Sequence, residues 1–565
     1  MPGFVDLAPE VIEDIFYYTQ DGSPSSNRSH LLSLQLVCKQ FTPIARRLFY
    51  RVIHLKRPLS GKKLLECLQF ARSERLGDLI RSLKITDAAL NERNLFSDLS
   101  QDDIVRQSSN LVELDSPVSS FAPLSDGRRP FASFPNTLKS LRLSPTFHRW
   151  SVSRYEDEYN SDDSEIQDGI AVITKADALS TLSIVPTSLT SLTISQAFVP
   201  DLSSSPATSL THLNSVVLDM TKTPYSTLKW LTSRSIVNRS LKSLKVWSCT
   251  SITAENLVEF FDLCGNDIED FTYKPSHEQG SSKFPALRLI RRAPNLRRLS
   301  LGNKAADHTL YPLLPRTLTH LTVSLPENHV NARLADIEPI IRTRLRNLVK
   351  FELYSQIYFP SPETSYPPVA KSEITSLREI RLSHVNTPGG ALESFLASVG
   401  STVHTLALHH VSSPFSSTLF SHCPKLRRLE LGRSGGFDED DDGDGVIDLF
   451  STTDHQYLHS LRVHFDSSLR LDDLIDELEV IRLVVPIRDG SGGAIVNTKY
   501  TYLRTLELVG NFPGDVLQVN ESGWTDSKKL DRLIELAKER GTLLLINGRI
   551  VKTMGELFVA LLNQN

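Results

Sequence analysis

The sequence predicts an α/β repeat protein in which short parallel strands line one face and helices and loops lie outside, behind a small N-terminal helical module. Three observations predict this fold. An apolar pattern typical of short strands recurs along most of the chain, turn-forming residues separate its copies, and the first fifty residues have helical spacing. A chain of 565 residues can form such an array as one long unit, because each repeat packs on its neighbours.

Residues 1–55 predict three short helices. Pro9 suits the first turn of a helix, Ile12 and Ile15 fall at helical spacing, and residues 21–27 have turn chemistry. A second apolar run includes Leu34 and Val37. Three helices of this size bury little apolar surface alone, so part of it is expected to meet another element or another protein. A linking helix is predicted within residues 56–78.

The repeated pattern has the form apolar-x-x-apolar-x-apolar and fills residues 79–515. From residue 189 to residue 458, its copies follow one another at roughly 22 to 32 residues, close to the period of known repeat arrays. The copies begin at Ile80, Leu111, Leu138, Leu189, Leu213, Leu241, Ile268, Leu296, Leu318, Leu348, Leu377, Val403, Leu426, Leu458 and Leu503. Residues 525–565 predict a C-terminal capping unit, with a helix around Leu533, a strand at 543–546 and a last helix at 554–562.

The last two apolar residues of each copy point into the core of such an array, and the residues beside them point to solvent on the concave face. In the first half these outward residues are small: Ser140, Ser191, Thr193, Ser215 and Ser243. From about residue 298 they become larger and charged: Arg298, His320, Lys350, Glu352, Glu379, Arg381, Arg428, Glu430 and Arg462. The register places Lys350 beside Glu379 and Glu352 beside Arg381. These side chains are either contacts for a bound protein or ion pairs within the sheet.

Two acidic segments interrupt the array, an insertion at about 154–169 and a loop at 438–448. In the loop, Asp440, Asp442, Asp444 and Asp448 follow the spacing of oxygen ligands in a calcium loop. Ser451 occupies the position where a bidentate Glu is needed, and the preceding segment is a predicted strand. The segment is therefore either a weak calcium site or an acidic loop between repeats.

Other chemical motifs give little support to catalysis. His404, His409, His410 and His422 are close in sequence to Cys423, but their spacing is irregular, so a zinc site is not predicted. No nucleophile elbow and no phosphate-binding GxxxxGK[ST] loop occurs. We expect no enzyme activity of the chain's own and no cofactor.

Composition and charge restrict the possible partners. The chain is 40% hydrophobic and 23% charged, with a net charge of -4, which gives no global attraction to nucleic acid or to an anionic membrane. Its five cysteines are scattered and form no Cys-x-x-Cys pair. No stretch approaches the roughly 18 apolar residues of a membrane span. A soluble protein of the cytoplasm or the nucleus is expected.

Two segments resemble a known family. The repeats resemble leucine-rich repeats, and the unit at 241–257, with Cys249 and a helix expected from about Ala254 to Cys264, resembles the cysteine-containing class found behind F-boxes. Cys423 lies at a similar approach to a strand, so these cysteines are expected to be buried apolar residues. The N-terminal pattern Leu-x-Pro-Glu-x-Ile, a gap, then Leu-x-Leu-x-Leu-Val-Cys resembles an F-box.

The resemblance implies an N-terminal three-helix F-box followed by a leucine-rich-repeat solenoid. It also implies a function, that of the substrate-recognition subunit of a Skp–cullin–F-box ubiquitin ligase. The repeats would bind an unidentified target protein on the concave face, and the adaptor would link the chain to a cullin. The residues that would dock the Skp-family adaptor are Leu7, Pro9, Ile12, Ile15, Leu34, Leu36 and Val37. The alternatives are a repeat scaffold without a role in ubiquitination, and an N-terminal helical cap that binds no adaptor.

Overall fold

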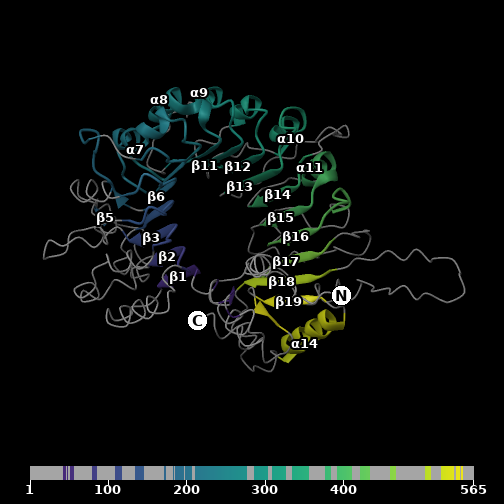
Figure 1. Ribbon diagram of the computed structural model, residues 1–565. Helices are drawn as coiled ribbons and strands as arrows, with labels where there is room; N and C mark the ends of the chain where they lie inside the picture. Colours follow the sequence, from purple (N-terminus) through teal and green to yellow (C-terminus); the bar gives the residue numbers. More distant parts are fainter. Residues whose placement is uncertain are drawn as a thin grey trace, which may run out of the picture. The chain divides into compact units, whose positions relative to one another are not determined.

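The chain forms two compact units, Met1–Ala293 and Pro294–Asn565, called here unit 1 and unit 2. The structure is a computed structural model (Figure 1). It describes residues 42, 44–45, 48, 51–55, 79–85, 109–117, 134–144, 171–172, 182, 185–195, 197–206, 210–275, 286–302, 308–325, 334–355, 376–383, 391–409, 420–432, 458–465, 503–510, 524–539, 542–546 and 549–551.

Unit 1 is a row of parallel strands with helices on one side. The strands pair in the order β1 (Val52–Leu55), β2 (Ser82–Ile85), β3 (Glu113–Pro117), β4 (Ser140–Ser144), β6 (Ser191–Ser195), β8 (Ser215–Asp219), β9 (Ser243–Trp247) and β10 (Asp270–Lys274). A separate parallel pair joins β5 (Ala171–Val172) to β7 (Ala197–Phe198). The helices α7 (Tyr225–Val237), α8 (Ala254–Cys264) and α9 (Ala286–Arg292) pack in sequence on the outer side (Figure 1).

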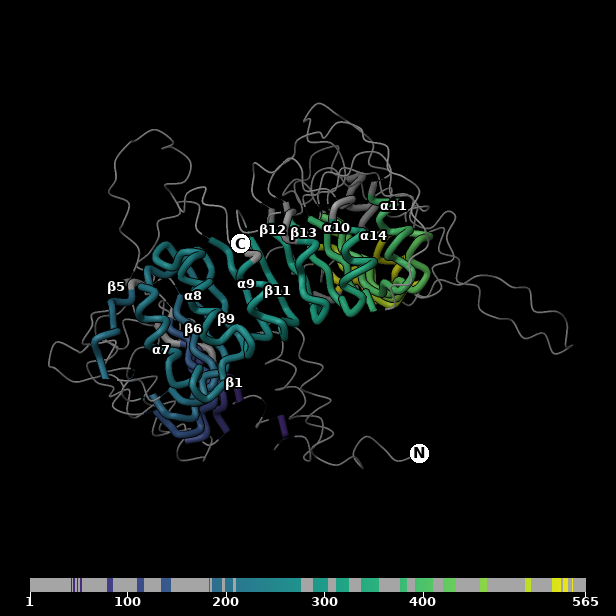
Figure 2. Tube along the Cα trace, turned by 90° about the horizontal axis from the view of Figure 1, so that it is seen from above, coloured from purple at the N-terminus to yellow at the C-terminus, as the bar shows by residue number. Residues whose placement is uncertain are grey.

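Unit 2 repeats the same plan. Its parallel strands are β11 (Arg298–Gly302), β12 (His320–Leu325), β13 (Lys350–Ser355), β14 (Glu379–Ser383), β15 (Thr405–His409), β16 (Arg428–Leu431), β17 (Ser460–Phe465), β18 (Thr505–Gly510) and β19 (Leu543–Ile546). The short β20 (Arg549–Ile550) pairs antiparallel with β19. Helices α10 (Leu334–Thr343) and α11 (Ala391–Val399) pack together outside the strands, and α14 (Trp524–Glu539) packs on β19. Figure 2 shows the successive turns of each unit side by side.

The predicted pattern is confirmed at every copy. Each of the fifteen apolar motifs coincides with a strand, β2 to β18 apart from β5 and β7. Strand β14 shows the reason, because Ile380 and Leu382 are fully buried while the residues on either side of them are partly exposed. Alternation of this kind points one set of side chains into the core and leaves the other on the helix-free face. The structure is therefore a leucine-rich-repeat array of the α/β class.

A recurring hydroxyl bond links adjacent repeats. The residue before the first apolar position of a motif is often Ser or Thr, and its hydroxyl donates to the carbonyl oxygen of the first apolar residue in the previous repeat. The bond lengths are 2.8 Å for Thr137 to Leu111, 3.0 Å for Ser188 to Leu138, 3.1 Å for Ser240 to Leu213, 2.7 Å for Thr317 to Leu296 and 2.7 Å for Thr402 to Leu377. These bonds satisfy carbonyls that no strand partner reaches at the turn. The Ser and Thr residues before the motifs thus connect neighbouring repeats.

Two details of unit 1 bear on the sequence predictions. The helix expected from Ala254 to Cys264 is present with those bounds, and Thr253 and Asn256 form a reciprocal capping box at its start. The sheet begins earlier than expected, because β1 pairs with β2 although Val52–Leu55 falls within the range assigned to the helical module. An apolar pattern of only four residues gave no periodicity from which to predict this strand.

The cysteine prediction is confirmed at three positions, because Cys249, Cys264 and Cys423 are all buried free thiols. The strand expected at 543–546 is present as β19, and the helix around Leu533 as α14. The predicted linking helix, the acidic insertion and the last helix at 554–562 lie outside the described residues. Among the residues that the structure describes, no helix combines the length and the apolar character needed to cross a membrane.

Candidate functional site

Three rows of side chains run across unit 2 on the face opposite the helices, which we call the open face. They arise because the parallel strands pair in register, so that equivalent motif positions line up from strand to strand. The first row is Arg298, His320, Lys350, Glu379, Thr405, Arg428, Ser460 and Thr505. The middle row is Ser300, Thr322, Glu352, Arg381, Ala407, Glu430, Arg462 and Glu507. The third row includes Ser324, Tyr354, Ser383, His409, His464 and Val509.

Four charged side chains on β13 and β14 form a closed group, the β13–β14 cluster. Lys350 Nζ lies 2.9 Å from Oε1 of both Glu352 and Glu379. Arg381 Nε lies 2.7 Å from Glu379 Oε1 and 3.6 Å from Glu352 Oε1. Thr322 Oγ1 donates to Glu352 Oε2 at 2.9 Å. Each cation therefore contacts both anions, and the cross-strand pairs predicted from the register are confirmed.

The electrostatics of this cluster follow from its half-buried position. Burial alone raises the pKa of Glu379, but the hydrogen bonds from Arg381 and Lys350 outweigh burial, so the pKa is lowered. Burial likewise acts to lower the pKa of Lys350, and its bonds to Glu352 and Glu379 more than compensate, so that pKa is raised. Lys350 and Glu379 are therefore held in their charged forms, and the two cations and two carboxylates of the cluster neutralise much of one another's charge within the face.

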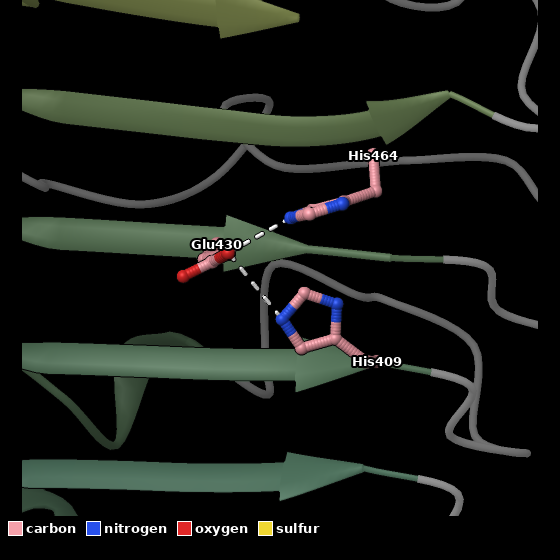
Figure 3. A group of neighbouring side chains, drawn as sticks. All are labelled: His409, Glu430 and His464. Atoms are coloured by element: carbon pink, nitrogen blue, oxygen red, sulfur yellow. Dashed lines mark hydrogen bonds and ion pairs between the residues drawn. The ribbon is translucent and has the colours of Figure 1, made fainter. Parts of the chain in front are cut away.

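A second charged group, the Glu430 cluster, lies on β15, β16 and β17. His464 Nε2 is 2.8 Å and His409 Nε2 is 3.5 Å from the same oxygen, Glu430 Oε1 (Figure 3). Arg462 Nη1 lies 3.4 Å from that oxygen, while Arg462 Nε lies 3.5 Å from Glu507 Oε2. The two imidazole rings meet edge to face, with centroids 4.6 Å apart. Two imidazoles and a guanidinium thus converge on one carboxylate oxygen.

Gly432 explains how two residues that are not on neighbouring strands come into contact. His409 and His464 follow the last apolar residue of their motifs, and the equivalent residue between them, after Leu431, is Gly432. A Cβ at Gly432 would lie 2.7 Å from His409 Nδ1 and 3.1 Å from His409 Cα. Because glycine has no side chain there, both rings can extend over β16 and reach Glu430 (Figure 3).

Hydrogen bonds and charge keep Glu430 ionised. The hydrogen bonds from His409 and His464 lower the pKa of this carboxyl far below its usual range, burial opposes them, and the charge of Arg462 lowers it further. Between the two clusters the middle row has Ala407, which is fully buried although it faces outward. The long side chains on either side of it, Arg381 and Glu430, interact electrostatically across this small residue.

The predicted contact residues share one surface. All nine of the larger outward residues, Arg298, His320, Lys350, Glu352, Glu379, Arg381, Arg428, Glu430 and Arg462, lie in the first or the middle row of the open face. The predicted adaptor-docking residues and the calcium candidates Asp440, Asp442, Asp444 and Asp448 lie outside the described residues.

The histidines considered for zinc do not gather as a group. Of His404, His409 and His422, only His409 takes part in the Glu430 cluster, and His422 instead faces Glu393 at 3.5 Å. His410 lies outside the described residues. Cys423 is completely buried, and burial raises the pKa of its thiol to about 12, so a thiolate ligand is not available there at neutral pH.

His464 was not predicted as a partner of His409. The signal was present, since the two residues occupy the same position after their motifs and the intervening motif ends in Leu431-Gly432. Glu507 and Thr322 were also not predicted, and they extend the charged rows toward β18 and β12.

Comparison with known proteins finds only distant likenesses. No protein-family model and no curated protein sequence matches this chain. Three solved structures are similar to it. An internalin from Listeria monocytogenes has 12% identity over 55% of this chain and 75% of that chain, with a TM-score of 0.27. A leucine-rich-repeat protein from Leptospira interrogans has 13% identity over 72% and 94%, with a TM-score of 0.29.

The third similar structure is a complex of TLR13 with ssRNA13. It has 12% identity over 90% of this chain and 64% of that chain, with a TM-score of 0.30. At these identities and TM-scores, the likenesses add nothing to what the register of the strands already establishes about the fold.

Proposed function

We propose that this chain is the substrate-recognition subunit of a Skp–cullin–F-box ubiquitin ligase, which binds its target protein on the open face of unit 2. The observation that carries the proposal is the charged open face itself. It presents three rows of side chains over eight paired strands, and none of the helices described in its own unit covers it. Repeat arrays generally bind partners on such a surface.

The chemistry of the face suits a folded or extended protein better than a small molecule. Arg298 and Arg428 are exposed in the first row, and partly exposed carboxylates alternate with cations in the middle row. Mixed charges of this kind select a partner by complementary pattern and accelerate its association. A row of alternating sign offers no single-sign groove of the kind that follows a nucleic-acid backbone.

The ubiquitin-ligase part of the proposal rests on the N-terminal resemblance to an F-box. There the residues Leu7, Pro9, Ile12, Ile15, Leu34, Leu36 and Val37 are assigned to the Skp-family adaptor. A receptor of this kind has no catalytic residue of its own, because it acts by holding target lysines near the ubiquitin-charged enzyme.

Co-purification of the full chain with a Skp-family adaptor and a cullin tests this part. We expect the double variant Ile15→Asp and Val37→Asp to lose both proteins, because a charge on the docking surface costs several kcal/mol when buried. The matched control is Val237→Asp, which changes an exposed apolar residue at the end of α7 (77% exposed) and is expected to retain both. If the wild-type chain captured neither adaptor nor cullin, only the alternative of a repeat scaffold without a role in ubiquitination would remain.

A further inference from the structure

We infer that His409, Glu430 and His464 form a binding site for a divalent transition-metal ion, with Zn²⁺ as the best-matched species. The inference concerns the three side chains alone and does not depend on a role in ubiquitination. Within the residues that the structure describes, this is the one group of three His, Cys, Asp or Glu residues whose ligand atoms all lie within 4.8 Å of one another.

The donor set fits zinc. Two imidazole nitrogens and one carboxylate oxygen are ligands that Zn²⁺ accepts with bonds of about 2.0 to 2.2 Å, and three protein ligands leave a fourth position for water. Tetrahedral geometry with such bonds requires ligand atoms roughly 3.3 Å apart. The distances from Glu430 Oε1 to the two Nε2 atoms, 2.8 Å and 3.5 Å, bracket that value. Bringing the two imidazole nitrogens to the same separation from each other requires side-chain rotation only.

The position of the ligands in the fold favours preorganisation. They come from three successive strands whose register is fixed by hydrogen bonds on both sides, so the backbone need not move when an ion binds. Gly432 leaves the space over the central strand empty of side chain, which lets both rings approach from opposite sides. The three side chains are 16% to 34% exposed, so an ion can enter from solvent and yet be partly shielded from it.

The surrounding charges leave one carboxylate in excess. The two clusters together contain four carboxylates (Glu352, Glu379, Glu430 and Glu507) and three cations (Lys350, Arg381 and Arg462). Arg462 competes with an ion for Glu430 Oε1, but its guanidinium also lies against Glu507. Metal binding therefore requires Arg462 to shift toward Glu507, and each imidazole to place its proton on Nδ1 so that Nε2 is free to bind.

The test is a titration with Zn²⁺ in which the metal-free full chain competes with a chromophoric chelator for the ion. We expect the double variant His409→Asn and His464→Asn to lose the tightest site. Changing an outer-shell partner of a ligand already costs 10- to 100-fold in affinity, so loss of two direct ligands should weaken binding by roughly 100-fold or more. The matched control is the double variant His404→Asn and His422→Asn, which removes two other partly exposed histidines and is expected to leave the tightest site unchanged.

If circular dichroism shows that the histidine variant is unfolded, a second variant still tests the inference. Arg462→Gln leaves all three ligands in place and removes the competing cation, so Zn²⁺ should bind several-fold more tightly. A purely structural Glu–His contact would show no such gain. Equal affinity of wild type and Arg462→Gln, or an unchanged tightest site in a folded His409→Asn and His464→Asn variant, would overturn the inference.

Discussion

In both units the parallel strands pair so that equivalent motif positions line up. The side chains that point away from the core differ between the two units. In unit 1 four consecutive paired strands carry serine in the first row, Ser140, Ser191, Ser215 and Ser243, with Glu113 and Asp270 on the strands that flank them. In unit 2 the same row is mostly charged or long, and its side chains reach those of the middle row. The inward leucines are buried alike in both units. The fold thus depends on the inward positions, and the outward positions are free to differ for binding.

A second feature is common to both units. Gly265 follows α8 and Gly400 follows α11, and each begins a short 3-10 turn that leads into the next strand. A Cβ at Gly400 would lie 2.7 Å from the carbonyl oxygen of His422, and one at Gly265 would collide with the carbonyl oxygen of Arg292. In each unit the glycine lets a helix end pack directly on the backbone of the following repeat.

The largest expected effect comes from substitutions at the buried inward positions, which both units share. Leu244→Ala in unit 1 and Leu406→Ala in unit 2 each remove a fully buried side chain, so each should lower the free energy of unfolding by roughly 2 to 5 kcal/mol. The outward neighbours Ser243 and Thr405 provide controls, since their change to Ala should stay within about 0.5 kcal/mol. Urea denaturation measures both. If the outward substitutions lowered the free energy of unfolding as much as the inward ones, the fold would not depend on the inward positions alone.

The glycines should give the next largest effect. Gly265→Ala and Gly400→Ala should each destabilise the chain by roughly 1 to 3 kcal/mol, because the added methyl meets backbone atoms that cannot move aside. Gly432→Ala is the comparison, since its methyl meets chiefly the His409 side chain, which can rotate away. Thermal unfolding should rank Gly432→Ala as the mildest of the three. The reverse order would contradict the assigned packing.

The smallest effect concerns the charge cluster on β13 and β14 of unit 2. The folded state lowers the pKa of Glu379 below its ordinary 4.5, so its ion pairs stabilise the fold above that pH, and this contribution is lost as the pH falls through the lowered value. Glu379→Gln should therefore cost about 1 kcal/mol at pH 7 and less at pH 3. Glu259→Gln, in the exposed pair with Lys229 on the helices of unit 1, should cost less at both.

Much of the fold was predictable because one pattern specifies it. The spacing of motifs such as Leu377, Ile380 and Leu382 determines both the strand and the inward face, so cross-strand neighbours such as Lys350 and Glu379 follow from alignment of the motifs. The Glu430 cluster did not follow in this way. It depends on contact between His409 and His464 across an intervening strand, which requires a residue without a side chain between them. Rules for side-chain pairs on adjacent strands do not cover a contact across an intervening strand.

The two interpretations of the charged rows, ion pairs within the sheet or contacts for a partner, can be separated by a charge swap. A variant with Lys350→Glu, Glu352→Arg, Glu379→Lys and Arg381→Glu keeps alternating pairs in the β13–β14 cluster and inverts the pattern shown to a partner. The matched control exchanges the exposed pair on the helices of unit 1, Lys229→Glu with Glu259→Lys. Neither swap alters the N-terminal residues assigned to the adaptor.

The most direct test of the proposed receptor is quantitative co-purification of adaptor, cullin and target proteins with the wild-type chain and these two variants. We expect the four-residue swap on the open face to lose the targets and to retain adaptor and cullin, while the swap on the helices retains all of them. Targets that remain bound after the charges of the open face are inverted would contradict the account.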